Sequence, residues 1–519
     1  MQVDLVANQG AGACPTPTSV AGLPSSSQNI TFSAGRPVSS GVYSYAAANN
    51  VTPYRNLRLR FTQGGASTCS LDNFAIRPQS FTVTSSNATN NQVTGTPIFK
   101  AGADNFNLTA TAVAGYDGTP LIDNAQLVGT PTAGTITGGF AAAAVVTGIA
   151  TGNTFTYSEV GNLGLSANAV YDDSWTAVDQ PGDCTNDASN ALVGGKYGCK
   201  VGSTAVAQTT GSSGFGRFVP NHFVLSGGSV AAASGTFSYM DQSFGVAFTL
   251  TAEKLGGGTT QNYAGNYAKL DPATAALWPS TTLGATGFAL GAVNAGLDLS
   301  TRTSVVGTPT GTWALGAATV AASLKFSRPT TLSVDATWGP YNALDLGIAP
   351  RDSDAIQLLP AALNLDASLP AGSERQKIQA TSTIQRLGRI RIPNAYGSER
   401  LPLPMVATAQ FYNGTGWATN TIDNSTTFNT ALSTAGGNLV VTVRTGLGGG
   451  VSVTSPGSTA VVAGTRTITL SAPGVSGSAD VSLNAPTYLL NPPSYLLNTP
   501  ALATFGIYKS PLIYRRENY

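Results

Sequence analysis

Charged side chains are scarce in this sequence. Asp, Glu, Lys and Arg make up 10% of its 519 residues, against about 25% in an average soluble protein. The formal net charge is +1, so the chain has no basic field that would attract nucleic acid or an anionic membrane. General disorder is also excluded, because disordered chains are usually charged and poor in apolar residues, whereas 42% of this chain is hydrophobic.

Histidine and cysteine are scarce as well. The only histidine is His222, and none of the four cysteines lies in a Cys-x-x-Cys pair, so we expect no zinc site. An even number of cysteines indicates two disulfides, and closeness in the sequence favours Cys14–Cys69 and Cys184–Cys199. The second would close a loop without apolar periodicity, a gain of about 3 kcal/mol in the chain-entropy model. Four buried free thiols are the alternative.

Long apolar runs are absent too. The longest, FAAAAVVTGIA at 140–150, is too short to span a bilayer. No signal peptide is visible, because Met1 is followed directly by QVDLVANQG. Two interpretations are open, a cytosolic protein or a fragment of a longer exported precursor. Composition and the cysteines favour the fragment, located outside the cell or at its surface.

Turn-forming residues, by contrast, are abundant. The 60 Gly and 29 Pro separate short runs rich in Thr and Val, which is typical of many short strands joined by turns. Alternating apolar and polar residues predict strands at 437–446 and 464–472. Residues 271–279 predict a helix of two turns capped by Asp271. We therefore expect an all-β protein, a tandem array of immunoglobulin-like antiparallel β-sandwich domains.

Two stretches of sequence recur at one interval. AIRPQSFTV (75–83) aligns with RFVPNHFVL (217–225), and FNLTATA (106–112) aligns with FTLTAEK (248–254), both at an offset of 142 residues. The shared offset predicts a duplicated module, with chance similarity among Thr-rich strands as the alternative. A shorter match, IPNAY (392–396) with VPNHF (219–223), indicates another strand that opens a domain.

These repeats divide the chain into four predicted segments. They are a small N-terminal β domain at 1–73, a first β-sandwich copy at 74–216, a second copy at 217–391, and a C-terminal β domain at 392–519. The last domain is predicted to end in a hairpin over 503–519, with Phe505, Ile507 and Tyr514 pointing inward, because apolar and polar residues alternate on both sides of the KSP turn.

Several long, irregular motifs together are similar to one known family. In chain order they are YRNLRLRF (54–61), CSLDNFAIRP (69–78), GRFVPNHF (216–223), WGPYNALDLGIAPRDSDA (338–355), GRIRIPNAYGSERLPLP (388–404) and ATFGIYKSPLIYRRENY (503–519). They resemble MshQ-like proteins, large accessory proteins of the mannose-sensitive haemagglutinin (MSHA) type IV pilus locus. The resemblance runs nearly end to end. It implies an exported, pilus-associated protein of a Gram-negative bacterium.

The candidate catalytic groups have simpler structural explanations. His222 lies in PNHFVL without the GxSxG elbow of a serine hydrolase, so a structural histidine is expected. The acid pairs Asp172–Asp173 and Asp352–Asp354 are more typical of turns, although glycosidases also use paired carboxylates. We therefore predict no catalytic residue, no cofactor and no metal site.

The aromatic residues of YNGTGW (412–417) are the predicted ligand platform. Tyr412 and Trp417 flank a turn, and aromatic rings stack on the apolar faces of sugars. The favoured function is a non-enzymatic surface protein, an adhesin or a structural or tip component of a type IV pilus, with pilus subunits or other surface proteins as partners. The alternative is a carbohydrate-binding or carbohydrate-active protein with surface glycans as ligands.

Overall fold

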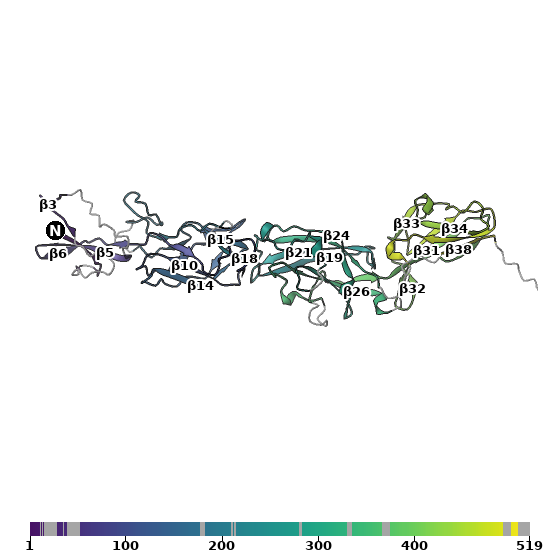
Figure 1. The fold of residues 1–519 in the computed structure, drawn as a ribbon, viewed down its shortest axis with the longest axis horizontal. Helices are drawn as coiled ribbons and strands as arrows, with labels where there is room; N and C mark the ends of the chain where they lie inside the picture. Colours follow the sequence, from purple (N-terminus) through teal and green to yellow (C-terminus); the bar gives the residue numbers. More distant parts are fainter. Residues whose placement is uncertain are drawn as a thin grey trace, which may run out of the picture. The chain divides into compact units, whose positions relative to one another are not determined.

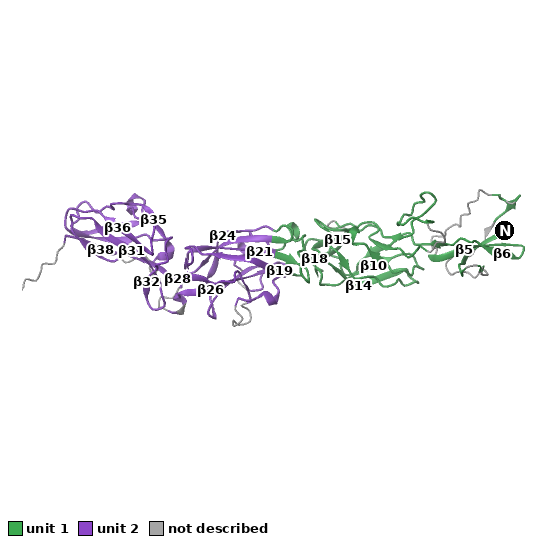
Figure 2. Ribbon diagram, turned by 180° about the vertical axis from the view of Figure 1, so that it is seen from behind, with its two compact units in different colours: residues 1–223, 251–269, 313–317 green, residues 224–250, 270–312, 318–519 purple. Residues whose placement is uncertain are grey.

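In the computed structural model, the regular secondary structure of the described residues consists of β-strands and a few short 3₁₀ turns (Figure 1). Two compact units are distinguished in Figure 2, one of residues 1–223, 251–269 and 313–317, and one of residues 224–250, 270–312 and 318–519. The structure describes residues 1–10, 12, 14, 28–34, 36–38, 52–176, 182–208, 211, 214–279, 283–329, 335–365, 374–490 and 500–506.

The N-terminal segment forms a five-stranded sheet around one long central strand. The strand order is β2-β1-β5-β6, and β7 also pairs with β5. The strands are β1 (Gln2–Ala7), β2 (Gln28–Asn29), β5 (Tyr54–Gln63), β6 (Ala66–Cys69) and β7 (Phe74–Ile76). The two short strands β3 (Phe32–Ser33) and β4 (Arg36–Pro37) form a separate pair. Cys69 at the end of β6 forms a disulfide with Cys14, and their Cα atoms lie 5.3 Å apart.

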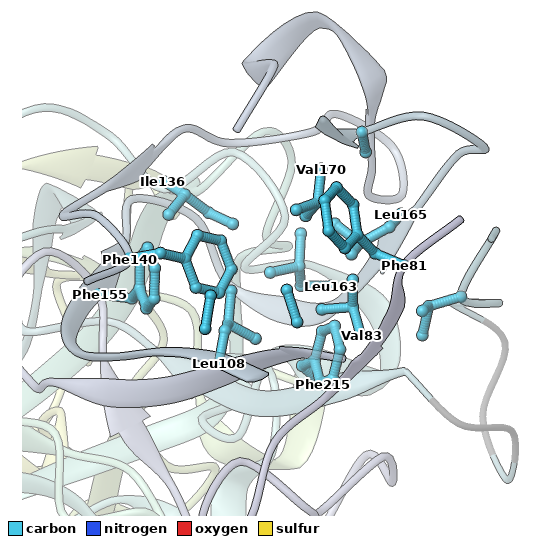
Figure 3. Packing of buried hydrophobic residues seen from close by; sticks show 14 of the residues in the cluster. Phe81, Val83, Leu108, Ile136, Phe140, Phe155, Leu163, Leu165, Val170 and Phe215 are labelled. Atoms are coloured by element: carbon cyan, nitrogen blue, oxygen red, sulfur yellow. The ribbon is translucent and has the colours of Figure 1, made fainter. Parts of the chain in front are cut away.

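The first β-sandwich consists of two four-stranded sheets, β13-β14-β10-β8 and β12-β15-β18-β9. The strands are β8 (Thr82–Thr84), β9 (Phe99–Lys100), β10 (Phe106–Thr111), β12 (Leu127–Val128), β13 (Ile136–Thr137), β14 (Ile149–Tyr157), β15 (Gly161–Leu165) and β18 (Phe215–Val219). Figure 3 shows the core between the sheets, where Leu108 and Phe155 of one sheet face Leu163 and Phe215 of the other. Alternation of apolar residues along β10 produces this buried face.

The second sandwich has the sheets β19-β21-β25-β24 and β20-β28-β26-β22-β23, with β27 paired to β26. The strands are β19 (His222–Ala231), β20 (Ser238–Tyr239), β21 (Ser243–Glu253), β22 (Gly287–Asn294), β23 (Leu297–Asp298), β24 (Thr303–Thr310), β25 (Ala317–Phe326), β26 (Tyr341–Arg351), β27 (Gln376–Lys377) and β28 (Thr383–Arg386).

A third sandwich follows. Its first sheet joins β31 to β29, β32 and β36, and its second has the order β30-β38-β37-β34. The strands are β29 (Gly388–Arg391), β30 (Ala395–Gly397), β31 (Leu403–Tyr412), β32 (Trp417–Thr419), β33 (Thr427–Asn429), β34 (Leu439–Thr445), β35 (Ser458–Ala460), β36 (Thr465–Leu470), β37 (Gly477–Leu483) and β38 (Ala501–Phe505). β33 and β35 form a separate pair.

The three sandwiches share one strand order, which we call the common frame. In each, one sheet contains the central strand (β10, β21 or β31) beside the opening strand (β8, β19 or β29). In the other sheet a short second strand runs parallel to the closing strand, as in β9 with β18, β20 with β28 and β30 with β38. The neighbouring pairs β10 with β14, β22 with β26 and β34 with β37 are antiparallel. Two sheets with this division of strands form an immunoglobulin-like sandwich.

The recurring sequence stretches lie on corresponding strands of the common frame. Phe106 of β10 and Phe248 of β21 are both fully buried on the central strand. The shorter match at 392–396 overlaps the start of β30, the second strand of the third sandwich. The predicted boundary between 216 and 217 falls inside β18, because the chain leaves the first sandwich only after this strand is complete, at Pro220.

One local prediction needs correction, and another lies largely outside the described residues. Residues 271–279 form only a single 3₁₀ turn at Ala275–Leu277 rather than a helix of two turns. Asp271 is not its cap, because Thr274 takes the N-cap position without a side-chain hydrogen bond, while Oδ1 of Asp271 accepts the backbone N–H of Ala273 at 3.0 Å. Phe505 is fully buried as predicted, but it ends β38, which lies between β30 and β37 inside a sheet. Ile507 and Tyr514 lie outside the described residues, as does the predicted hairpin turn.

Because the sandwiches share the common frame, truncating a core side chain at corresponding positions should lower their stability to a similar extent. Leu108→Ala and Leu250→Ala each remove a side chain that is fully buried and should lower the free energy of unfolding by about 2–5 kcal/mol. Urea denaturation measures this. Leu401→Ala is the matched control, because its side chain is 64% exposed and the change should stay within about 0.5 kcal/mol. A core variant as stable as this control would contradict the central position of its strand.

Candidate functional site at the loop end of the first sandwich

His222 is a buried histidine with structural partners. It begins β19 and is 6% exposed. Its Nδ1 lies 3.1 Å from Oδ1 of Asn221, and its Nε2 lies 3.7 Å from Oε2 of Glu253. Burial lowers the pKa of His222, and the Glu253 carboxylate opposes this shift. The position therefore fits the structural role expected from the sequence.

Asp172 is the centre of a buried hydrogen-bond network. Its Oδ2 accepts the hydroxyl proton of Tyr116 at 2.7 Å and the indole N–H of Trp175 at 3.2 Å. Its Oδ1 accepts the backbone N–H of Ser174 at 2.8 Å. Burial, followed by the bond to Asp172, raises the pKa of Tyr116. The neighbouring Asp173 is exposed, so the two carboxylates have different environments and do not form a catalytic pair.

Asp352 also has a structural role, in a turn at the end of β26. It is 1% exposed, and its Oδ1 accepts the backbone N–H groups of Asp354 at 2.9 Å and Ile356 at 2.8 Å. Side-chain oxygens that bind the backbone two residues ahead are typical of Asx turns. The sequence prediction of turn residues fits this geometry.

The predicted ligand platform at Tyr412 and Trp417 is not an open aromatic surface. Tyr412 is 6% exposed, and its hydroxyl donates to the carbonyl of Gly414 at 2.8 Å. Its ring meets the ring of Trp338 at 5.5 Å. The guanidinium of Arg389 lies 4.2 Å over the ring of half-buried Trp417, and burial lowers the pKa of Arg389 to about 10. The turn folds Tyr412 inward, which the sequence motif did not reveal.

Neither a metal site nor a membrane helix occurs among the described residues. No three His, Cys, Asp or Glu side chains lie together in a way that would hold a metal ion. In the same part of the chain, no helix has the length and apolar character needed to cross a membrane.

Three connections of the first sandwich meet at one end, which we call the loop end. They join β10 to β12, β13 to β14 and β15 to β18. Ala114, Val145 and Trp175, one from each connection, line the same pocket. Short strands within the first and third connections pair with each other, namely β11 (Leu121–Ile122), β16 (Val170–Asp172) and β17 (Val201–Gly202). Immunoglobulin variable domains carry their binding loops at such an end.

The connection from β15 to β18 contains the disulfide loop, residues 184–199. Cys184 and Cys199 are bonded to each other, as predicted, with their Cα atoms 5.3 Å apart. At its tip, Val193 and Lys196 exchange backbone hydrogen bonds of 3.0 and 3.1 Å. The two residues between them, Gly194 and Gly195, have φ angles of 59° and 82°, which a two-residue type I′ hairpin turn requires.

Arg77 fixes the disulfide loop from outside. Its Nε donates to the carbonyl of Gly198 at 2.7 Å, and its Nη2 donates to the carbonyl of Ser189 at 2.7 Å. Its Nη1 donates to Oδ1 of Asn190 at 3.0 Å. Burial lowers the pKa of Arg77, with the carboxylate of Asp187 opposing the shift. The planar guanidinium suits this task because it holds several donors in a fixed geometry.

A cleft lies between the segment leading out of β7 and the disulfide loop. Its lining includes Asp72, Phe74, Arg77, Gln79, Trp175, Lys196 and Tyr197. Trp175 is covered on its ring faces by Tyr116, with centroids 6.1 Å apart, and by the guanidinium of Arg55 at 4.3 Å. Tyr197, at 53% exposure, presents the accessible ring of this cleft.

The tip of the disulfide loop is exposed and carries three apolar side chains beside Lys196. Leu192 is 59% exposed, Val193 65% and Tyr197 53%. The sequence analysis identified the loop and its disulfide but assigned it no function. The available signal was the run ASNALVGG (188–195), which has the large aliphatic residues Leu192 and Val193 and no charge.

Two family models match most of the second half of the chain. Residues 201–377 match the model of the DUF6701 third domain, and residues 386–518 match that of the DUF6701 fourth domain. The chain contains DUF6701 domains. The first match includes β18 of the first sandwich and most of the second sandwich, and the second match includes the third sandwich. DUF6701 domains are consistent with the MshQ-like resemblance.

Comparisons with curated proteins and solved structures add little. No curated protein matches. A structure of FdeC, an Escherichia coli adhesin, is 12% identical over 83% of this chain and 100% of that chain, with a TM-score of 0.30. The Yersinia pseudotuberculosis adhesin InvE is 11% identical over 55% of this chain and 60% of that chain, with a TM-score of 0.17. Scores this low carry no argument about fold or function.

The buried environment of His222 predicts a pH dependence of stability. Its pKa is lowered in the folded state, so the unfolded chain, with a pKa near about 6.5, binds the proton more readily. The stability contributed by neutral His222 is therefore present above that value and decreases as the pH falls below it. Since the chain has one histidine, NMR of a histidine-labelled sample measures its pKa directly. A value above about 6.5 would contradict the described environment.

Arg77→Lys should loosen the disulfide loop without unfolding the sandwich. A lysine ammonium cannot reproduce the planar set of donors, and hydrogen bonds from a charged group contribute about 1.5–3 kcal/mol each. Limited trypsin cleavage at Lys196, measured after reduction, should become at least about tenfold faster. Arg400→Lys is the control, because its side chain is 86% exposed. Equal cleavage rates in both variants would show that Arg77 does not hold the loop.

Proposed function

We propose that the chain is a non-enzymatic surface protein associated with a type IV pilus, acting as an adhesin or as a structural or tip component. The observation that supports this most directly is the loop end of the first sandwich. There an immunoglobulin-like frame carries a disulfide loop, fixed by Arg77, with three exposed apolar side chains near its tip. A rigid loop on a β-sandwich scaffold is a common arrangement for binding another molecule.

The disulfides support an extracellular location. Both pairs are formed within the described part of the chain, and disulfides persist in oxidising compartments such as the periplasm or the cell exterior. The MshQ-like resemblance, with which the DUF6701 domains are consistent, supports the association with a pilus locus. Pilus subunits are accordingly the first partners to test.

The environments of the candidate catalytic residues support binding rather than catalysis. His222 is buried beside Asn221 and Glu253, and Asp172 accepts hydrogen bonds from three neighbouring residues. These contacts use the groups to stabilise the sandwich. The buried ring of Tyr412 gives no specific support to the carbohydrate alternative.

Binding to assembled pili tests the proposed function. The full chain, immobilised through an added terminal tag, should retain purified MSHA-type pili in a saturable manner. Immunogold labelling of intact bacteria that encode the chain should place it at the cell surface, and counting label along the filaments distinguishes tip from shaft. Maltose-binding protein with the same tag is the control surface. Absence of both pilus binding and surface labelling would overturn the proposal.

A further inference from the structure

Only one residue separates the last strand of the second sandwich from the first strand of the third. β28 ends at Arg386, β29 begins at Gly388, and Leu387 between them is fully buried. This boundary lies wholly within the compact unit drawn in purple in Figure 2, and the DUF6701 third and fourth domains adjoin there. Linked domains usually move relative to each other unless the interface between them is large and apolar.

Three side chains of the second sandwich, Tyr239, Arg328 and Trp338, cross this boundary, and we call their contacts the joint. Tyr239 of β20 is fully buried and packs, with Phe237, in the apolar cluster that contains Leu489 of the third sandwich. Its ring stacks on the ring of Tyr488 with centroids 5.7 Å apart. The core of the third sandwich is therefore completed by residues of the second.

The hydroxyl of Tyr239 also serves a buried carboxylate of the third sandwich. It donates to Oδ2 of Asp423 at 2.9 Å and accepts from Nδ2 of Asn420 at 2.7 Å. Asp423 is fully buried, and Thr426 donates to it through the backbone N–H at 3.0 Å and the hydroxyl at 2.7 Å. Burial, followed by the charge of Asp423, raises the pKa of Tyr239. Separating the sandwiches would break this charge-assisted bond and expose the surrounding apolar surface to water.

The other two contacts of the joint have different chemistry. Arg328, which follows β25 and is 6% exposed, donates from Nη2 to the carbonyl of Leu490 at 2.9 Å. Trp338 is also buried, and its ring meets the rings of Tyr412 and Trp417 with centroids 5.5 and 6.3 Å apart. The aromatic turn that the sequence marked as a ligand platform is thus part of the joint.

We propose that the second and third sandwiches fold and unfold as one cooperative unit, held together by the joint. A state with one sandwich folded and the other unfolded is rare, because the folded one would expose the surfaces of the joint to water. A load applied to one sandwich is passed to the other, since the single linking residue, Leu387, is itself buried. The two matched family domains are therefore one unit in mechanical and thermodynamic terms.

Native-state hydrogen exchange of the full chain tests this inference. Peptides are followed by mass spectrometry at rising low urea concentrations, under conditions in which the exchange rate follows the opening equilibrium. The slowest amides of β26 in the second sandwich and of β31 in the third should show the same dependence on urea, because a single opening exposes both.

A mild core substitution should act across the joint. Ile468→Val, at a side chain 1% exposed in the third sandwich, should speed exchange about two- to tenfold, by the same factor in β26 and β31. Val462→Ala, at a side chain 71% exposed in the same sandwich, is the control and should leave both strands unchanged.

Tyr239→Phe tests the joint itself. The substitution keeps the buried ring and removes the hydroxyl that donates to Asp423. Exchange should become at least about tenfold faster in both strands. Tyr396→Phe, at a side chain 54% exposed in β30, is the matched control, with no change expected in β26.

The results separate one unit from two independent sandwiches. If Ile468→Val speeds exchange in β31 but leaves β26 within about twofold of the wild type, the third sandwich unfolds alone and the inference is wrong. Different urea dependences of the two strands in the wild type have the same meaning. Unchanged exchange in Tyr239→Phe would overturn the role of the joint. None of these outcomes depends on a pilus, so they leave the proposed function to its own test.

Discussion

Burial of one face of the central frame strand is the constraint on which each sandwich depends. Leu108 on β10, Leu250 on β21 and Ala407 on β31 are all fully buried between the two sheets. With so few charged residues in the chain, its stability comes mainly from apolar packing between sheets rather than from ion pairs, and exposed pairs contribute little in any case. The same frame recurs where buried and less buried residues alternate along the central strand. The connections between the strands can differ from one sandwich to the next.

Connections of the frame have three distinct uses in this chain. Some cover their own sandwich, as Ile356 does. Others join neighbouring sandwiches within a compact unit. The Glu159 carboxylate, after β14, accepts the backbone N–H groups of Gln261 and Asn262 at 3.0 and 3.1 Å, and the hydroxyl of Tyr239 donates to Asp423 at 2.9 Å. The disulfide loop presents a group of exposed apolar side chains, Leu192, Val193 and Tyr197, and this exposure supports the functional proposal.

Much of the fold could be predicted from local sequence, because strand alternation, turn residues and cysteine spacing act over short distances. The alternation at Phe106 and Leu108 predicted a half-buried strand, and Cys184 and Cys199 predicted their own pairing. The third copy of the frame showed only the short sequence match at IPNAY. Its central strand has Met405 and Ala407 facing the core instead of Phe and Leu, so it does not resemble the other two in sequence. Identical topology does not require identical core side chains when total packing is maintained.

The candidate site was harder to predict, because it depends on contacts between distant residues. Arg77 reaches Ser189 and Gly198 more than one hundred residues away, and nothing in its local sequence indicates that role. The burial of Tyr412 within its motif was hard to predict for the same reason. Exposure of an aromatic ring is decided by its tertiary neighbours, in this case Trp338 and Arg389.

Cross-linking within the third sandwich tests the common frame most directly. The frame requires β30 to run parallel to β38, with Tyr396 opposite Thr504. Cysteines introduced together at these two positions should react with a short bifunctional thiol reagent, since the four native cysteines are already paired. Tyr396→Cys combined with Leu502→Cys, two residues out of register, should react much less. Preferential cross-linking of the out-of-register pair, or no reaction of either pair in the folded chain, would contradict the claim that one frame occurs three times.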